Sequence, residues 1–299
     1  MLGKDMFKLV LCLFIGMNVQ AAELKVLSWN AYMLPKIAKK TFQNTRAKLI
    51  ANHDTMKESD IIMFQEVFTK KSFKIISEEL LKTHPYHTGK PFRSFFKPIN
   101  SGLVIFSKYP LSDIRFKLYK GMAHADFFSS KGVLMATATL PDNQKVRLAT
   151  THLQAQSGEK YTRIRSRQLE VIRKSLFEGY ANDDLPLIFG GDFNISHHSP
   201  LHEYFWDFMD FHGAEYLKPQ GKLIWSAEYA TNDMLKCLSD NTDKQKWIDF
   251  VFLHPKKSNL KMIDFQIHNF TGSYDLYETG EKSEYSLSDH HAAEATISL

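Results

Sequence analysis

The chain has 299 residues, of which 43% are hydrophobic and 24% charged, proportions that are typical of globular proteins. A chain of this length buries a large core without needing disulfide bonds, and no sequence period recurs that would indicate a repeat protein. The formal net charge of +5 at pH 7 is a small excess spread along the sequence. It is compatible with an anionic membrane or with nucleic acid as a partner, and it does not choose between them.

Residues 1–21 predict a secretory signal peptide. Two lysines precede an apolar run at residues 9–19, and cleavage is expected near Ala21. This run is too short to cross a bilayer, which takes a helix of about 20 residues. Cleavage would remove Cys12 and leave Cys237 alone, so the mature protein would form no internal disulfide. Export without disulfides suits a secreted bacterial protein.

Residues 22–299 are expected to form a single domain, because no stretch rich in proline, glycine or serine indicates a linker. Helical periodicity is present at residues 41–56 and 161–177. Most of the basic side chains of the second helix are expected on its solvated face. Runs of β-branched and aromatic residues predict strands at 24–29, 61–65, 102–107, 133–140, 146–151, 187–191, 247–253 and 292–298. This order predicts an α/β layered sandwich whose loops hold a site at one rim.

Polar residues stand beside several of these apolar runs, where a core would not favour them. They are Asn30, Glu66, His152, Asp192, Asn194, Asp249, Asp289 and His290. If the strands share one edge, carboxylates, amides and imidazoles meet in one pocket, and such a set suits metal-assisted phosphoryl chemistry. Each motif alone is more often a helix cap, a turn or a surface pair.

Magnesium prefers oxygen ligands, so Glu66, Asp289 and the amide oxygen of Asn30 are the predicted metal ligands; manganese is an alternative ion. His152 and Asn194 are predicted to donate hydrogen bonds to the charge that builds on the phosphoryl oxygens. The attacking water needs a base. His290 held by Asp249 is one candidate, and Asp192 is the other.

Taken together and in order, these residues resemble the motif series of the endonuclease/exonuclease/phosphatase superfamily over essentially the whole predicted mature chain. The resemblance implies a four-layered α/β sandwich of the deoxyribonuclease-like type, with two packed mixed β-sheets flanked by helices. It also implies cleavage of phosphate esters with a divalent metal.

Residues 125–132, 151–155 and 225–232 are similar to segments of the bacterial sphingomyelinase C branch. This resemblance implies hydrolysis of sphingomyelin to ceramide and phosphocholine at a phospholipid membrane. It adds four residues to Asn30 as substrate or phosphate contacts, namely Asp126, Lys131, Trp225 and Asn232. Two departures stand out, since the branch has Trp-Asp at 225–226 and Leu-Asp-Tyr at 248–250. Lys131 could instead be a solvated turn lysine.

The aromatic hairpin with which some members of the branch enter membranes has no Trp-Phe tip before residue 288. Residues 92–97 alternate aromatic and basic side chains and are either an interfacial surface or ordinary core. A metal-dependent secreted endonuclease of the deoxyribonuclease type is the main alternative function, and an inactive binding module is a weaker one. The favoured interpretation is a monomer with no nucleic-acid partner.

Overall fold

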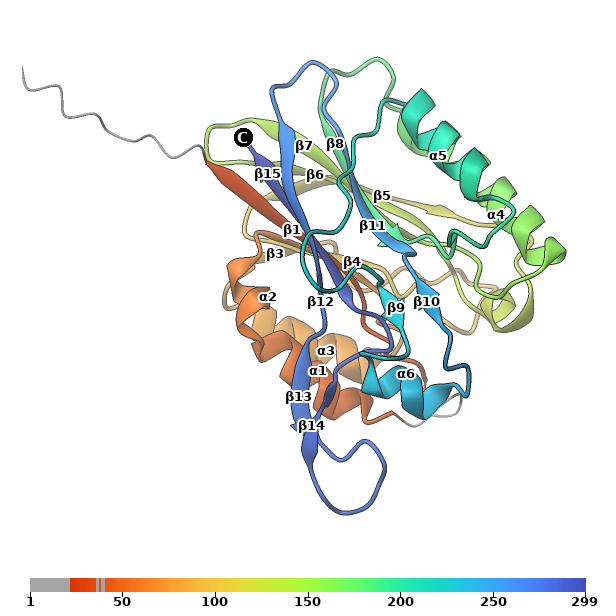
Figure 1. Cartoon of the computed structure of the whole chain (residues 1–299). Helices are drawn as coiled ribbons and strands as arrows, with labels where there is room; N and C mark the ends of the chain where they lie inside the picture. Colours follow the sequence, from red (N-terminus) through yellow and green to blue (C-terminus); the bar gives the residue numbers. More distant parts are fainter. Residues whose placement is uncertain (1–21, 36–37, 39–40) are drawn as a thin grey trace, which may run out of the picture.

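Two β-sheets packed face to face form the centre of the computed structural model (Figure 1), which describes residues 22–35, 38 and 41–299. The predicted signal peptide lies outside these residues. The first sheet has six strands in the order β12-β15-β1-β2-β4-β3. Their bounds are β1 Glu23–Asn30, β2 Ile61–Gln65, β3 Tyr86–His87, β4 Val104–Ser107, β12 Lys261–His268 and β15 Ala292–Ser298.

The second sheet has five strands in the order β11-β8-β7-β6-β5. Each sheet has one parallel pair, β1 with β2 and β7 with β8, among antiparallel neighbours. Both sheets are therefore mixed, as predicted. The bounds of the second sheet are β5 Leu111–Leu118, β6 Gly132–Thr139, β7 Lys145–His152, β8 Leu187–Asp192 and β11 Asp249–His254.

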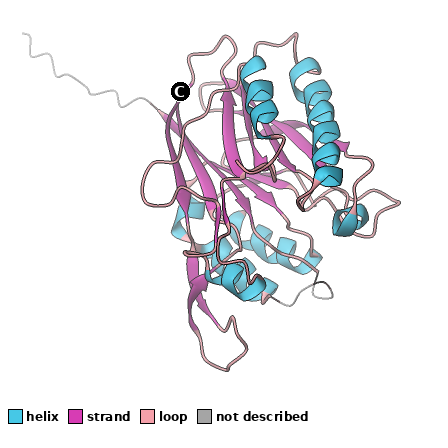
Figure 2. Cartoon of the chain, turned by 45° about the vertical axis from the view of Figure 1, so that its right-hand side comes forward, coloured by secondary structure: helices cyan, strands magenta, loops and turns pink. Residues whose placement is uncertain are grey.

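Helices cover the outer face of each sheet, which gives four layers (Figure 2). Side chains alternate along a strand, so Val26 and Met63 enter a core between the sheets, whereas Leu27 and Phe64 face the helices α1 and α3. A third hydrophobic cluster joins the second sheet to α4 and α5. The helices are α1 Gln43–Asn52, α2 Asp54–Glu58, α3 Lys70–Leu80, α4 Glu159–Ile172, α5 His202–Phe211 and α6 Asp233–Leu238. The predicted four-layered sandwich is confirmed.

Neither predicted helix is a single α-helix over its whole predicted length. The first ends at Asn52 and restarts at Asp54, because His53 is extended and caps α2 through its ring nitrogen. The second continues beyond α4 as a π-helical turn, η2 (Arg173–Glu178). None of the helices within the described ranges is long and apolar enough to cross a membrane.

Two short ribbons and a 3-10 turn lie outside the sheets. The ribbons pair β9 (Ala227–Glu228) with β10 (Gln245–Lys246), and β13 (Thr271–Tyr274) with β14 (Ser283–Ser286). The second ribbon is the hairpin at the bottom of Figure 1. The turn is η1 (His124–Phe128). Of these, η1 borders the site described next.

Strand direction collects the polar residues at one rim. Asn30 pairs with Gln65 at the ends of β1 and β2, and His152 pairs with Asp192 at the ends of β7 and β8. Asp249 opens β11 rather than lying within a strand from 247, and it pairs with Asp192 because β11 is antiparallel to β8. Gly191 permits this pairing, since a Cβ there would lie 2.3 Å from the carbonyl oxygen of Thr151.

Candidate active site

Glu66 follows β2 with a positive φ of 59°, an unusual conformation for a residue other than glycine. Gly102 lies against it, and a Cβ there would come within 2.9 Å of the Glu66 backbone. The side chain is 13% exposed, yet its buried Oε2 has no hydrogen-bond partner. Burial, followed by the negative charge of Asp289, raises the pKa of Glu66 to about 8. A divalent cation would supply the positive charge and the bonding partner that this carboxylate lacks.

Asn30 stands between the two halves of the site. Its Nδ2 donates to Asp192 Oδ2 at 3.1 Å, and its Oδ1 accepts from the backbone N–H of Tyr32 at 3.1 Å. The amide oxygen thus faces its own loop and retains one lone pair. Of the three predicted metal ligands, Glu66 and Asp289 are close enough for their charges to interact, and Asn30 is tied to Asp192.

Asp192, Asp249 and His290 form the three-residue group that could hold a metal ion within the described part of the chain, with one ligand atom from each lying within 4.8 Å of the others. Asp249 is fully buried, and its Oδ1 has no partner. The sequence assigned these three residues to catalysis and placed the metal on Glu66, Asn30 and Asp289. The structure therefore offers carboxylates for a cation on both sides of Asn30.

The Asp249–His290 pair is held at 2.8 Å between Oδ2 and Nδ1. Burial raises the pKa of Asp249 to about 6, although the positive charge of His290 acts to lower it. Burial opposes charge on His290, but the carboxylates of Asp249, Asp192 and Asp289 prevail and raise its pKa. Without a cation, the imidazole thus holds a proton that a general base would have to lose.

Lys131 is buried at the centre of a polar cluster, not solvated in a turn. Its Nζ lies 2.8 Å from Asp126 Oδ1 and 2.9 Å from His152 Nε2, and it donates to the carbonyl oxygen of Leu153 at 3.0 Å. Asp126 is fixed in turn by the backbone N–H of Ala155, 2.8 Å from its Oδ2. The cluster places a cation beside the rim.

His152 lies between this cluster and the carboxylates, with its Nε2 3.3 Å from Asp192 Oδ2 and 3.8 Å from Glu66 Oε1. Burial and the positive charge of Lys131 hold its pKa well below the usual value, so the ring is neutral. Nε2 accepts from Lys131, and the proton then sits on Nδ1, which is buried without a partner. Asn194, in the left-handed region at φ 51°, donates weakly to the carbonyl oxygen of Leu153.

Asn232 is buried and has a structural role. Its Oδ1 caps α6 by accepting from Leu235 N, and its Nδ2 donates to the carbonyl oxygen of Ser288 at 2.9 Å. Since both ends of the amide are engaged in the fold, the predicted substrate contact is not supported. Trp225 is half-buried, packs against His197 with the two rings tilted by 34°, and lines a cavity of about 540 Å³.

Two buried arginines were missed as supports of the rim. Arg46 of α1 is fully buried and donates to the carbonyl oxygens of Ala31, Tyr32 and Leu287, so it ties together the loops that carry Asn30 and Asp289. Arg165 of α4 is buried and donates to the carbonyl oxygens of Gln154 and Gln156. The sequence signal that could have identified them as buried is the position of an arginine on the apolar face of a helix.

Comparison with known proteins matches residues 27–290 to the Endonuclease/Exonuclease/phosphatase family. Sphingomyelinase C from Bacillus cereus is 25% identical over 96% of this chain and 94% of its own length. Sphingomyelinase C 2 from Leptospira interrogans is 26% identical over 79% of this chain, and the match spans only 40% of that longer protein. A solved structure of β toxin from Staphylococcus aureus with bound magnesium ions shares the fold, with a TM-score of 0.80, 22% identity, and coverage of 92% of this chain and 99% of that one.

Proposed function

Because this chain belongs to the endonuclease/exonuclease/phosphatase family, we propose that it is a secreted, Mg²⁺-dependent phosphodiesterase of the phospholipase C type that hydrolyses sphingomyelin to ceramide and phosphocholine. The relatives named above support a phosphodiester hydrolase, with the metal dependence typical of the family. The choice of lipid rests on the similarity to sphingomyelinases. The predicted signal peptide is the basis for secretion, and a monomer is proposed.

The observation that carries this proposal is the carboxylate of Glu66. It is nearly buried, its Oε2 has no partner, and the charge of Asp289 adds to the cost of ionising it. Oxygen ligands of this kind fit Mg²⁺, and Mn²⁺ would fit the same donors. Glu66 with Asp289 and Asn30 would hold the ion, and the group of Asp192, Asp249 and His290 is a second place where an ion would fit. The ion supplies Lewis-acid stabilisation of the charge on the phosphoryl oxygens and the leaving alkoxide.

The remaining residues would stabilise the phosphoryl group. Asp126 holds Lys131, whose positive charge would lie beside the phosphoryl oxygens, and Asn194 and His152 would donate hydrogen bonds to them. An attacking water would be oriented by Asp192, or would be deprotonated by His290 after that imidazole has lost its own proton. The Asp249 carboxylate fixes the ring of His290 through its Nδ1.

The test is hydrolysis by the mature protein of sphingomyelin vesicles, phosphatidylcholine vesicles and plasmid DNA, each with Mg²⁺ and with chelator. We expect phosphocholine from sphingomyelin vesicles only when the metal is present. Nicked DNA with intact lipid would replace this proposal by the endonuclease, and inactivity on all three substrates with every metal would leave only the binding module.

A further inference from the structure

Four phenylalanines lie exposed on two neighbouring loops. The exposed fractions are 91% for Phe95, 88% for Phe96, 56% for Phe127 and 52% for Phe128. Each adjacent pair stacks edge to face, with ring centroids 5.4 Å apart in both pairs. We call these four side chains the aromatic patch. A contiguous group of exposed aromatic rings costs free energy in water, so it indicates a surface that is covered in use.

The two loops are fastened to each other, so the patch is one surface. The backbone N–H of Ser94 donates to Ser130 Oγ at 3.1 Å, and that of Ile99 donates to the carbonyl oxygen of Phe128 at 3.1 Å. Lys97 Nζ lies 4.3 Å from the ring centre of Phe127 and donates to the Phe127 carbonyl oxygen. The residues at 92–97 that the sequence left open between interface and core are therefore exposed at Phe95 and Phe96.

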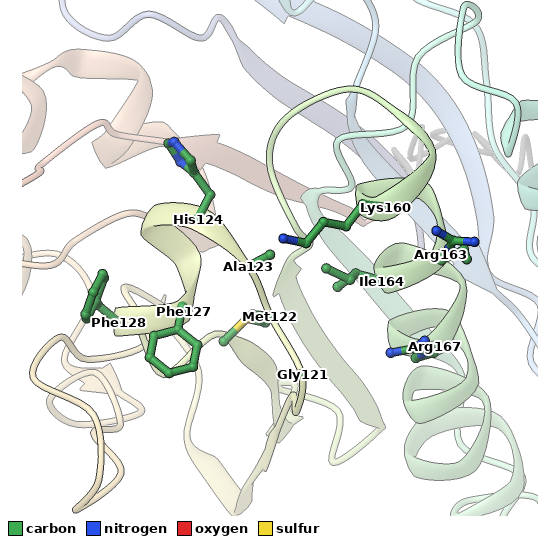
Figure 3. Close-up of a pocket in the computed structure, with 10 residues that line it drawn as sticks. All are labelled: Gly121, Met122, Ala123, His124, Phe127, Phe128, Lys160, Arg163, Ile164 and Arg167. Carbon is green, nitrogen blue, oxygen red and sulfur yellow. The ribbon is translucent and has the colours of Figure 1, made fainter.

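A groove of about 690 Å³ lies beside the patch, between η1 and α4 (Figure 3). Phe127 and Phe128 form one side, and α4 contributes three cations, Lys160, Arg163 and Arg167. Figure 3 shows Lys160 and Arg167 extending toward the segment 121–124. Arg163 pairs with Glu159, whereas Lys160 and Arg167 have no carboxylate partner among the residues that the structure describes. We call this the cationic groove.

Patch and groove both adjoin the candidate active site. They share η1, and the residue of η1 that precedes Phe127 is Asp126, which is ion-paired to Lys131 beside His152. A ligand that covers the patch and the groove therefore lies next to the rim where the phosphodiester is expected. The groove is positively charged, so it is complementary to an anion.

We propose that the aromatic patch and the cationic groove together dock this chain on a phospholipid bilayer containing anionic lipid, with the phenylalanines in the interface and Lys160 and Arg167 on lipid phosphates. The inference rests on the proposed function, which assigns the neighbouring candidate active site to phosphodiester hydrolysis. Anionic lipid attracts cations held near the membrane surface, and a phenylalanine ring that leaves water for the interface gains hydrophobic free energy. The rings meet in edge-to-face pairs rather than as separate stacking platforms along a groove, which favours lipid over single-stranded nucleic acid.

The β13–β14 hairpin does not provide a comparable surface. Its connecting segment, residues 275–282, carries three acidic residues and one lysine, and Leu276 in it is buried. Tyr277 packs edge to face on Tyr285. The apolar surface beside the site is thus formed by the phenylalanine loops.

The experiment measures sedimentation of the mature protein with vesicles of phosphatidylcholine and sphingomyelin, with and without phosphatidylglycerol, in chelator so that no lipid is hydrolysed. We expect the double substitution Phe95→Ser and Phe96→Ser to lower partitioning roughly tenfold or more on both vesicles. Lys160→Gln with Arg167→Gln is expected to abolish only the preference for phosphatidylglycerol. Phe211→Ser, which removes an 83% exposed ring outside the patch, and Lys257→Gln are the matched controls.

Equal partitioning of the phenylalanine variant and the Phe211 control would overturn the role of the aromatic patch in docking. If the unaltered protein showed no preference for phosphatidylglycerol, the role of the cationic groove would be overturned. Loss of binding to single-stranded DNA in the same variants, without loss of lipid binding, would assign the surface to nucleic acid. Hydrolysis of a water-soluble phosphocholine ester serves as the folding control and is expected to be unchanged. Vesicle binding in chelator, together with no release of phosphocholine from the same sphingomyelin vesicles when Mg²⁺ is supplied, would refute the proposed function and leave the docking surface standing.

Discussion

Single residues at the rim keep bonding capacity that the fold does not use. Glu66 Oε2, Asp249 Oδ1 and His152 Nδ1 are buried and have no partner. Buried polar atoms are normally satisfied, so open ones at one rim indicate a ligand that brings its own charge and donors. The perturbed pKa values of Glu66, Asp249 and His290 have the same origin, since these groups are held together out of water.

The substitution Glu66→Gln tests the metal at this scale. Because the folded protein raises the pKa of Glu66 to about 8, this carboxyl group binds more protons in the folded than in the unfolded chain, and its own contribution to metal-free stability falls as pH rises from about 4.5 to 8. We expect the variant to lose less stability over that range in chelator, as measured by thermal unfolding. It should also gain less from added Mg²⁺ and lose turnover on the order of 10³-fold. Glu78→Gln, an exposed carboxylate, is the control; an unaltered Mg²⁺ requirement in Glu66→Gln would remove Glu66 from the metal.

The substitution Asp249→Asn tests the choice of base. Asp249 raises the pKa of His290, so its removal is expected to lower that pKa and move the corresponding limb of the kcat/KM profile to lower pH. The rate is expected to fall by roughly 10² or more, since the imidazole also loses its orienting partner. Profiles with Mg²⁺ from acid to alkaline pH measure both effects. A limb that stays in place would assign the base to Asp192.

At the scale of elements, the segment between β14 and β15 carries Asp289 and His290 into the rim without regular structure of its own. Arg46 of α1 holds the Leu287 carbonyl oxygen, and Asn232 at the start of α6 holds that of Ser288. Ser288 Oγ donates to the carbonyl oxygen of Asn30 at 2.6 Å. Two helices and the end of β1 therefore position the last two site residues.

The substitution Asn232→Ala removes both the cap of α6 and the donor to Ser288. We expect a loss of about 2 kcal/mol in the free energy of unfolding, measured with denaturant. Thr69→Ala, which removes the cap of α3, is a matched control that leaves the Ser288 segment intact. KM should stay unchanged in Asn232→Ala, while kcat falls as Asp289 and His290 lose their support. A raised KM with unchanged kcat would restore the predicted substrate contact.

At the scale of the whole molecule, the two-sheet sandwich buries many groups that titrate. Burial lowers the pKa of histidines in several layers, namely His53, His84, His87, His212, His254 and His291. His84 is completely buried, with its Nε2 2.8 Å from the carbonyl oxygen of Ser59. These rings are neutral in the folded protein at neutral pH.

A lowered pKa means that the unfolded chain binds more protons, so stability is lost as pH falls below about 6.5. Each such group contributes up to about 1.4 kcal/mol per pH unit over the range between its two pKa values. We expect the midpoint temperature of thermal unfolding to decrease as pH is lowered from neutral to acid. The substitution His84→Gln is expected to make this decrease with pH shallower while lowering stability at neutral pH. An equal slope in the variant would show that His84 is not among the groups responsible.

The sequence by itself determined the layered α/β class and most of the strands, because side-chain alternation and apolar runs are local signals, whereas the two packed sheets were implied by the resemblance to the superfamily. It also placed Asn30, Glu66, His152 and Asp192 at one rim, since parallel neighbouring strands end at the same edge. The tertiary structure decided which residues pair across strands and which side chains are buried. The antiparallel register put Asp249 at the rim from the start of its strand, and burial made Lys131, Arg46 and Arg165 internal cations. Asn232 caps α6 through a local bond to the backbone N–H of Leu235, but its second bond, to the carbonyl oxygen of Ser288, joins residues 56 positions apart along the chain and is beyond the reach of any local pattern.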